Sequence, residues 1–214
     1  FSPLKSWLDM PVRTISGYEP FAPARDGGEC DGSVPVRFVS SAPDQTASSI
    51  LNMYVLAIRS SQRYVAITSG YFVPPIQLSR ALVDAAERGV DVRLLLQGQT
   101  DEPTVRRISI GYYGKLLGRG VRIYEWDRSV LHAKTAVIDD AWATVGSANL
   151  DGRALFLNYE ANAEIHDAVF SRRMKVQFDE DCAHAREVTL AEWKSRPVGQ
   201  RTQEILLYPL EDQF

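Results

Sequence analysis

The sequence predicts an α/β fold in which a layered, mixed β-sheet is flanked by helices. Strand-like and helix-like segments alternate between residues 36 and 124, as they do in parallel βαβ units. Between residues 131 and 165 the alternation breaks, and three strand-like segments follow one another, so the predicted sheet is mixed. A chain of 214 residues that is 45% hydrophobic and 24% charged is long enough for one such core and short for two.

Apolar periodicity and helix-ending glycines define the alternating part. Residues 50–58 carry apolar side chains at the spacing of an amphipathic helix, and residues 90–96 are almost continuously apolar, as in a buried strand. Gly89 and Gly118 each follow a helix-like segment, as is typical of helix ends. The predicted elements are, in order, a strand at 36–39, a helix at 50–58, a strand at 63–72, a helix at 77–88, a strand at 90–96, a helix at 103–117 and a strand at 121–124.

The later part predicts strands at 131–138, 141–146 and 158–165, and then a long helix from about Val169 to Val188. Residues 1–34 are rich in proline and lack periodicity. They are interpreted as a connecting segment, and residues 35–214 as the folded domain.

Charge and cysteine content narrow the function classes. A formal net charge of −3 and a pI near 5.7 argue against a nucleic-acid binder held by bulk electrostatics. Cys30 and Cys182 lie far apart without metal-ligand spacing, so free thiols in a reducing compartment and no metal site are expected. The sequence shows neither a signal peptide nor an apolar run of the roughly 18–20 residues needed to span a bilayer.

A histidine and a lysine two residues apart form the first candidate pair. Side chains two apart share one face of a strand, so His132 and Lys134 are expected to point the same way from residues 131–138. Such a pair on one face of a strand is suited to attack a phosphate: the lysine would neutralise phosphoryl oxygens, while the histidine would bond to phosphorus or shuttle a proton. For His132 alone, an ordinary structural side chain is the better interpretation. Asp139 has the opposite parity, so structural hydrogen bonds or ion pairs are expected of it.

Two later segments add polar groups of the kind that bind phosphate. Gly146 lets the backbone turn or approach a ligand closely, and Ser147 and Asn149 can donate hydrogen bonds to one phosphate. Taken alone, Gly-Ser-x-Asn is a common turn sequence. The alternating polar residues of 158–165 predict either a half-solvated edge strand or a strand from which Glu160 orients a histidine.

Together these residues form His-x-Lys-x4-Asp-x6-Gly-Ser-x-Asn, which resembles the HKD signature of the phospholipase D superfamily. Glu160 lies where members of that family place a histidine-orienting carboxylate. Segments such as Tyr71–Pro74 and residues 112–117 are similar to the second half of bacterial cardiolipin synthases, and the similarity runs from about Val36 to Pro197. The resemblance implies a phospholipase D-like half, with residues 1–34 as the tail of a first half and the connection to it.

The resemblance also implies a mechanism that uses two motifs. Family members transfer a phosphodiester through a phosphohistidine, with one histidine from each motif and without a metal or cofactor. The chain has three histidines, and neither His166 nor His184 begins a second motif. The second histidine is therefore expected from a preceding first half or from a second copy in a homodimer.

The partners implied by the resemblance are phosphatidylglycerol as substrate and a membrane surface, with no nucleic acid expected. The implied place is the cytoplasmic side of the cell membrane, held peripherally or by an anchor outside this chain. Three other functions stay open: a phospholipase D hydrolase, a homodimeric nuclease of the same superfamily and a non-catalytic scaffold domain. The acidic pI disfavours the nuclease, and the intact motif disfavours the scaffold.

Several other side chains have two interpretations each. Tyr71, Phe72 and Pro74 either border a substrate channel or end a core strand. Arg106 and Arg107 either meet lipid headgroups or, as preferred, lie on a solvated helix face. Arg153 either has a role in the framework of the fold, as the resemblance implies, or forms a salt bridge near a helix start, which is the preferred interpretation.

Overall fold

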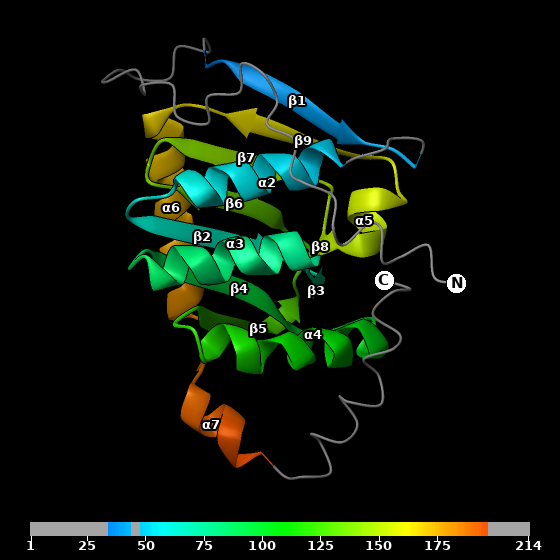
Figure 1. The fold of residues 1–214 in the computed structure, drawn as a ribbon, viewed down its shortest axis with the longest axis vertical. Helices are drawn as coiled ribbons and strands as arrows, with labels where there is room; N and C mark the ends of the chain where they lie inside the picture. The colour runs from blue at the N-terminus through cyan, green and yellow to red at the C-terminus, as the bar shows by residue number, and fades with distance from the viewer. Residues whose placement is uncertain (1–33, 44–47, 197–214) are drawn as a thin grey trace.

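The computed structural model describes residues 34–43 and 48–196 and confirms the α/β class (Figure 1). Its elements, in chain order, are β1 (Val36–Ser41), α2 (Ser49–Ser60), β2 (Tyr64–Ser69), β3 (Phe72–Val73), α3 (Ile76–Glu87), β4 (Asp91–Gln99), α4 (Pro103–Leu117), β5 (Arg122–Val130), β6 (Lys134–Ile138), β7 (Trp142–Gly146), β8 (Leu150–Asp151), α5 (Gly152–Phe156), β9 (Glu160–Ile165), α6 (Ala168–Ala183), β10 (Arg186–Val188) and α7 (Leu190–Ser195). The predicted helix at 103–117 coincides with α4.

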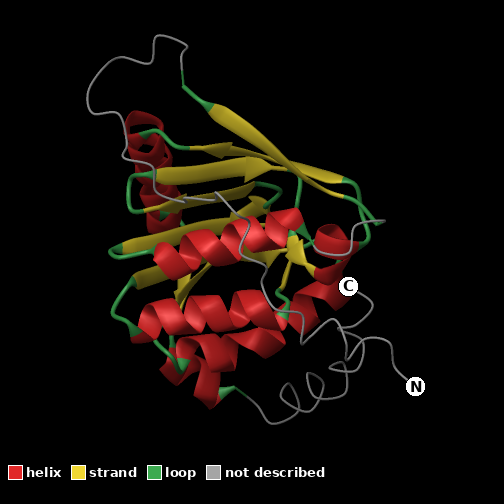
Figure 2. Cartoon of the chain, turned by 45° about the horizontal axis from the view of Figure 1, so that its top comes forward, coloured by secondary structure: helices red, strands yellow, loops and turns green. Residues whose placement is uncertain are grey.

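The described residues form three layers, in which one mixed sheet lies between helices on both of its faces. The eight strands of this sheet are ordered β1-β9-β7-β6-β2-β4-β5-β10, and β3 pairs with β8 in a separate two-stranded sheet. Helices α2, α3 and α4 cover one face, and α6 crosses the other (Figures 1 and 2). The larger core lies under α2 and α3, where Tyr54 packs edge-on against Trp142. Each large apolar side chain buried there contributes roughly 1.5–3 kcal/mol.

Strand direction brings distant parts of the chain to one edge of the sheet. Strands β2, β4 and β5 are parallel, and β6 is antiparallel to β2 with Lys134 opposite Ser69. Because β7 and β9 continue the antiparallel pairing, the end of β7 at Gly146 and the start of β9 lie at this same edge. We call it the catalytic edge, after the residues predicted to be catalytic that lie there. It contains the carboxyl ends of the parallel strands, where open α/β sheets commonly bind their ligands.

Several predicted elements differ from the observed ones. The strand predicted at 63–72 is divided into β2 and β3, and the strand predicted at 121–124 continues to Val130 as β5. The strand predicted at 131–138 begins only at Lys134, because the preceding residues pack against Gly70 rather than pairing with a strand: a Cβ on Gly70 would lie 2.8 Å from the carbonyl oxygen of Leu131. The long helix predicted to reach Val188 ends at Ala183, and the chain turns back as β10 to pair with β5.

Strand β9 is not the half-solvated edge strand that its polar alternation suggested. It lies between β1 and β7, and the side chains of Asn162 and Glu164 are completely buried. Asn162 donates to Thr144 Oγ1 at 3.2 Å, and Glu164 accepts from Trp142 Nε1 at 2.8 Å and pairs with Arg37. Buried polar groups require such partners, so this polar face belongs to the interior.

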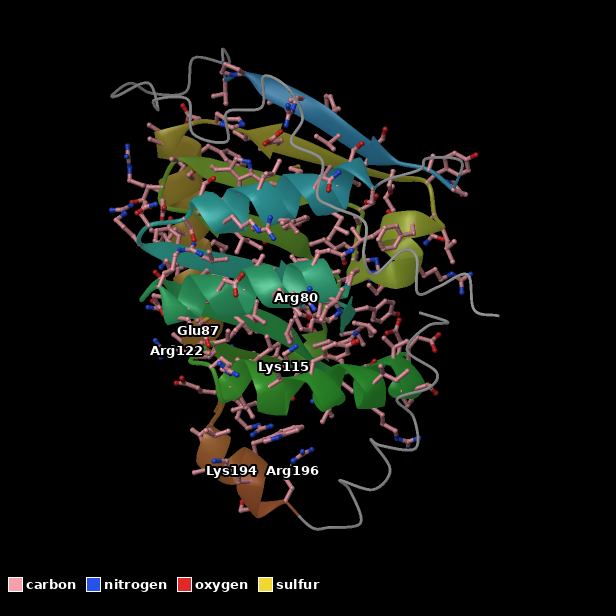
Figure 3. The ribbon with its side chains drawn as sticks, in the orientation of Figure 1. Arg80, Glu87, Lys115, Arg122, Lys194 and Arg196 are labelled. Carbon is pink, nitrogen blue, oxygen red and sulfur yellow. The ribbon has the colours of Figure 1, made fainter. Side chains whose placement is uncertain are left out.

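Within the described residues the last helix, α7, packs on α4. Trp193 of α7 contacts Tyr113 with ring centroids 5.6 Å apart, and Arg196 lies over the Trp193 ring (Figure 3, where Lys194 and Arg196 are labelled). No helix within the described ranges is long and apolar enough to cross a membrane. Cys182 is a buried free thiol; Cys30 and nearly all of the predicted connecting segment 1–34 lie outside the described residues.

Candidate active site

The catalytic edge gathers the motif residues from three separate segments. His132 precedes β6, Lys134 begins it, Ser147 and Asn149 follow β7, and Glu160 begins β9. The sheet register fixes this arrangement, since Lys134 is paired with Ser69 and Gly146 with Asn162. Residues up to 28 positions apart in the sequence therefore meet at one edge.

Lys134 is buried, whereas His132 is exposed. The Lys134 ammonium donates to the backbone carbonyl oxygen of His132 at 2.7 Å. Burial lowers the pKa of Lys134, and the negative charges of Glu160, Asp151 and Asp101 act against that effect. An ammonium has three donors, so two remain for a phosphate. The two residues do not share a strand as predicted, because His132 lies in the segment before β6.

Ser147 and Glu160 are hydrogen-bonded to each other. The Ser147 hydroxyl donates to Glu160 Oε2, and the backbone N–H of Ala161 donates to Ser147 Oγ at 3.1 Å. Asn158 Nδ2 reaches Glu160 Oε1 at 3.4 Å. Within the described residues these are the bonds that hold the carboxylate, so the orientation of a histidine by Glu160 stays a prediction.

Asn149 is oriented by the segment that follows β2. Its Oδ1 accepts from the backbone N–H of Tyr71 at 3.2 Å, and the Tyr71 carbonyl accepts from the Leu150 N–H at 3.3 Å. Pairing of β3 with β8 continues this connection. The bond to Oδ1 fixes the orientation of the side chain, and the amide Nδ2 of Asn149 can donate toward a phosphate.

Two motif residues serve the framework of the fold. Asp139 follows β6 at the opposite edge, and its carboxylate accepts from the backbone N–H groups of residues 62, 63 and 64 at 2.6, 2.9 and 2.8 Å. These are structural hydrogen bonds of the kind expected for it. Gly146 is required by packing, because a Cβ there would lie 2.3 Å from Asn162 Oδ1. The close approach is thus to β9.

The remaining candidates lie in varied surroundings. Arg106 is neither on a solvated face nor free for lipid headgroups, since it pairs with the buried Glu125. Arg107 and Arg153 are exposed, Phe72 is in the core, and Tyr71 is half-buried.

The other two histidines have partners away from the motif. His166 lies 3.3 Å from Glu164, and His184 Nδ1 lies 2.8 Å from the carbonyl oxygen of Glu180. Among residues 34–43 and 48–196, no three His, Cys, Asp or Glu side chains could hold a metal ion.

Two carboxylates near the motif were not found from the sequence. Asp101 follows β4, and Asp151 ends β8, where it caps α5 by accepting from the Ala154 N–H at 2.7 Å. Burial raises the pKa of Asp151, the hydrogen bond from the Ala154 N–H lowers it, and the charge of Glu160 adds to the rise, so that the net pKa is about 6. The Asn-x-Asp spacing after the motif was the available sequence signal for Asp151.

Asp151→Asn is expected to stabilise the protein more near pH 7.5 than near pH 4.5. The folded-state pKa of Asp151 is raised, so the folded state binds more protons than the unfolded one between the two pKa values, and stability falls as pH rises to about 6. Asparagine caps helices as well as aspartate does and carries no charge. Melting temperatures at both pH values test this, with Asp167→Asn at the N-cap of α6 as the capping control. An equal shift at both pH values would contradict it.

Comparison with known proteins identifies the family. The family described as "Cardiolipin synthase, PLD-like domain" matches residues 54–182. The chain is 36% identical to the major cardiolipin synthase ClsA of Bacillus subtilis over 173 residues, covering 81% of this chain and 36% of that protein. It is 34% identical to a cardiolipin synthase of a Geobacillus species, covering 97% of this chain and 41% of that protein. The chain thus spans about two fifths of these relatives.

Solved structures share the fold. A phospholipase D family member, Nuc from Salmonella typhimurium, superimposes with a TM-score of 0.62 at 18% identity, covering 72% of this chain and 98% of Nuc. Phosphatidylserine synthase from Haemophilus influenzae gives a TM-score of 0.66 at 14% identity, covering 83% of this chain and 46% of that enzyme. Together with the family match, this places the motif residues on a phospholipase D-type sheet. The chain belongs to the family of cardiolipin synthase PLD-like domains.

Proposed function

We propose that this chain supplies one of two half-sites of a phosphatidyltransferase of the cardiolipin-synthase type. The observation that carries the proposal is the catalytic edge, where His132, Lys134, Ser147, Asn149 and Glu160 come together in a member of that family. Phosphatidylglycerol serves as both donor and acceptor of the phosphatidyl group.

The reaction has two displacements at phosphorus. One motif histidine forms a bond to phosphorus, and glycerol leaves with a proton from the other histidine. That second histidine then takes the proton of the acceptor hydroxyl, whose oxygen attacks phosphorus and releases the first histidine. The free donors of Lys134 and the Asn149 amide stabilise the phosphoryl oxygens. The Ser147 hydroxyl, which donates to Glu160 in this structure, turns to the phosphate on binding and leaves Glu160 to orient a histidine.

The half-site formed by this chain needs a second half-site, because it lacks a second histidine and has little net positive charge. Neither His166 nor His184 is bonded to motif residues. Lys134 is surrounded electrostatically by three carboxylates, which reduces its attraction for a phosphate. Residues 35–214 form the second half in this proposal, and a preceding half of the same polypeptide supplies the other motif; a second copy of this chain is the alternative. The complete site acts at the cytoplasmic surface of the cell membrane.

The proposed transferase function is tested by incubating the assembly that contains both half-sites with phosphatidylglycerol vesicles and, separately, with single-stranded DNA. A metal chelator is present in both incubations. The expected products are cardiolipin and glycerol in equal amounts, with no cleavage of DNA. Phosphatidic acid in place of cardiolipin would identify a hydrolase. Cleavage of DNA without lipid turnover would identify a nuclease, and loss of lipid turnover in chelator would contradict a metal-free mechanism.

A further inference from the structure

The carboxylate of Asp101 lies beside His132 at the catalytic edge. The last paired residues of the parallel strands β4 and β5 are Gln99 and Val130. Asp101 comes two residues after the first and His132 two residues after the second, so the two chains leave the sheet side by side. Burial raises the pKa of Asp101, but hydrogen bonds and the charge of His132 outweigh it, and the net pKa is lowered. The group is therefore an anion at neutral pH.

Two neighbouring side chains hold Oδ1 of Asp101. The Tyr71 hydroxyl donates to Oδ1 at 3.0 Å, and the buried Gln97 amide donates to the same atom at 3.3 Å. A carboxylate has about four lone-pair sites, so Oδ2 keeps capacity to accept further hydrogen bonds. Asp101 is also exposed, which leaves this acceptor accessible to a ligand.

Tyr71 connects this acceptor to the phosphate donors. Its backbone N–H binds Asn149, its backbone carbonyl accepts from Ser69 Oγ at 2.6 Å, and its side chain holds Asp101. One residue thus fixes the position of Asp101 relative to Asn149. A phosphate bound by Lys134 and Asn149 would have its ester substituent within the region that Asp101 borders.

We propose that Asp101 is a specificity-determining residue that accepts a hydrogen bond from a hydroxyl of the alcohol exchanged at phosphorus, so that the half-site selects polyols such as glycerol. The inference rests on the proposed phosphatidyl transfer. A second phosphate would be repelled by the carboxylate. A headgroup ammonium would be attracted by Asp101 but repelled by the neighbouring Lys134 ammonium, whereas a neutral hydroxyl donates to Asp101 without meeting that repulsion.

Partitioning of one phosphatidyl-enzyme intermediate between two alcohols tests the proposal. The active assembly is given phosphatidylglycerol with both isotopically labelled glycerol and 1-propanol, and the ratio of labelled phosphatidylglycerol to phosphatidylpropanol is measured. Because both products come from the same intermediate, the donor step cancels in this ratio. Asp101→Asn is expected to lower the glycerol preference by about tenfold to a hundredfold, the effect of losing a hydrogen bond to a charged group. Tyr71→Phe is expected to lower it by a smaller factor.

Glu102→Gln is the matched control, since it removes one neighbouring carboxylate whose side chain does not cap α4. It is expected to keep the wild-type ratio. An unchanged ratio in Asp101→Asn, or an equal loss of transfer to both alcohols, would overturn the assignment while leaving phosphatidyl transfer intact. Better transfer to ethanolamine than to glycerol by the wild type would identify a cation site instead. If the wild type forms no transfer product, the proposed function fails as well.

Discussion

His132→Ala is expected to lower cardiolipin formation by at least about 10²–10⁴-fold, the range for loss of a general acid or base. The imidazole is either the nucleophile or the acid, and within the described residues no other histidine lies at the catalytic edge. Because His132 is exposed, the folded structure should be retained, with stability changed by roughly 0.5 kcal/mol at most. Lipid product analysis and a thermal melt of the same preparation measure both.

His184→Ala supplies the matched control. It makes the same substitution at an exposed histidine that caps α6, and wild-type turnover is expected. A phosphodiester with a nitrophenol leaving group separates the two roles, because such a leaving group needs no proton. Recovery of the His132→Ala rate with this substrate indicates the acid, and continued inactivity indicates the nucleophile. More than a tenth of the wild-type rate with phosphatidylglycerol would show that His132 does neither.

The positions of Lys134 and Asp139 could be predicted from the motif spacing because both residues lie at the ends of one short strand, β6. Lys134 begins this strand and Asp139 follows its last residue, so the four residues between them span the sheet. The histidine and lysine thus lie at the catalytic edge, while Asp139 holds backbone N–H groups at the opposite edge. The structural hydrogen bonds expected of Asp139 are observed, but the length of β6 rather than strand parity separates it from Lys134; that Asp139 takes no part in the chemistry stays a prediction.

Nonlocal pairing explains what the sequence did not predict. Asp101 and His132 are neighbours only because β4 and β5 pair in one particular register, and no pattern within either segment shows that register. The polar alternation of β9 suggested solvent exposure as one alternative, because the elements that enclose this strand, α2 with Tyr54 and the paired strand β1, come from residues more than a hundred positions earlier. Arg106 was interpreted as a surface residue because its partner Glu125 lies on another element.

Glu125→Ala is expected to destabilise the protein by about 3–5 kcal/mol, as when one partner of a buried ion pair is removed. The Glu125 carboxylate is buried and pairs with Arg106 of α4 and Arg186 of β10, so it connects a helix to the edge strand through β5. Without it, the guanidinium of Arg106, whose side chain is only 15% exposed, stays desolvated and unpaired. Domains of this kind have a total stability of about 5–15 kcal/mol, so most of the margin is lost.

Urea unfolding at fixed temperature measures this loss, and Glu187→Ala is the matched control. Glu187 lies on the same strand pair, but it and its partner Arg122 are each 43% exposed, so a loss of about 0–1 kcal/mol is expected. The double variant Glu125→Leu with Arg106→Met should recover much of the stability, because an apolar pair removes both the unpaired charge and its desolvation cost. If Glu125→Ala is no less stable than Glu187→Ala, the buried ion pair does not stabilise the contact between α4 and β5. If the double variant is no more stable than Glu125→Ala, the carboxylate has a packing role that leucine cannot replace.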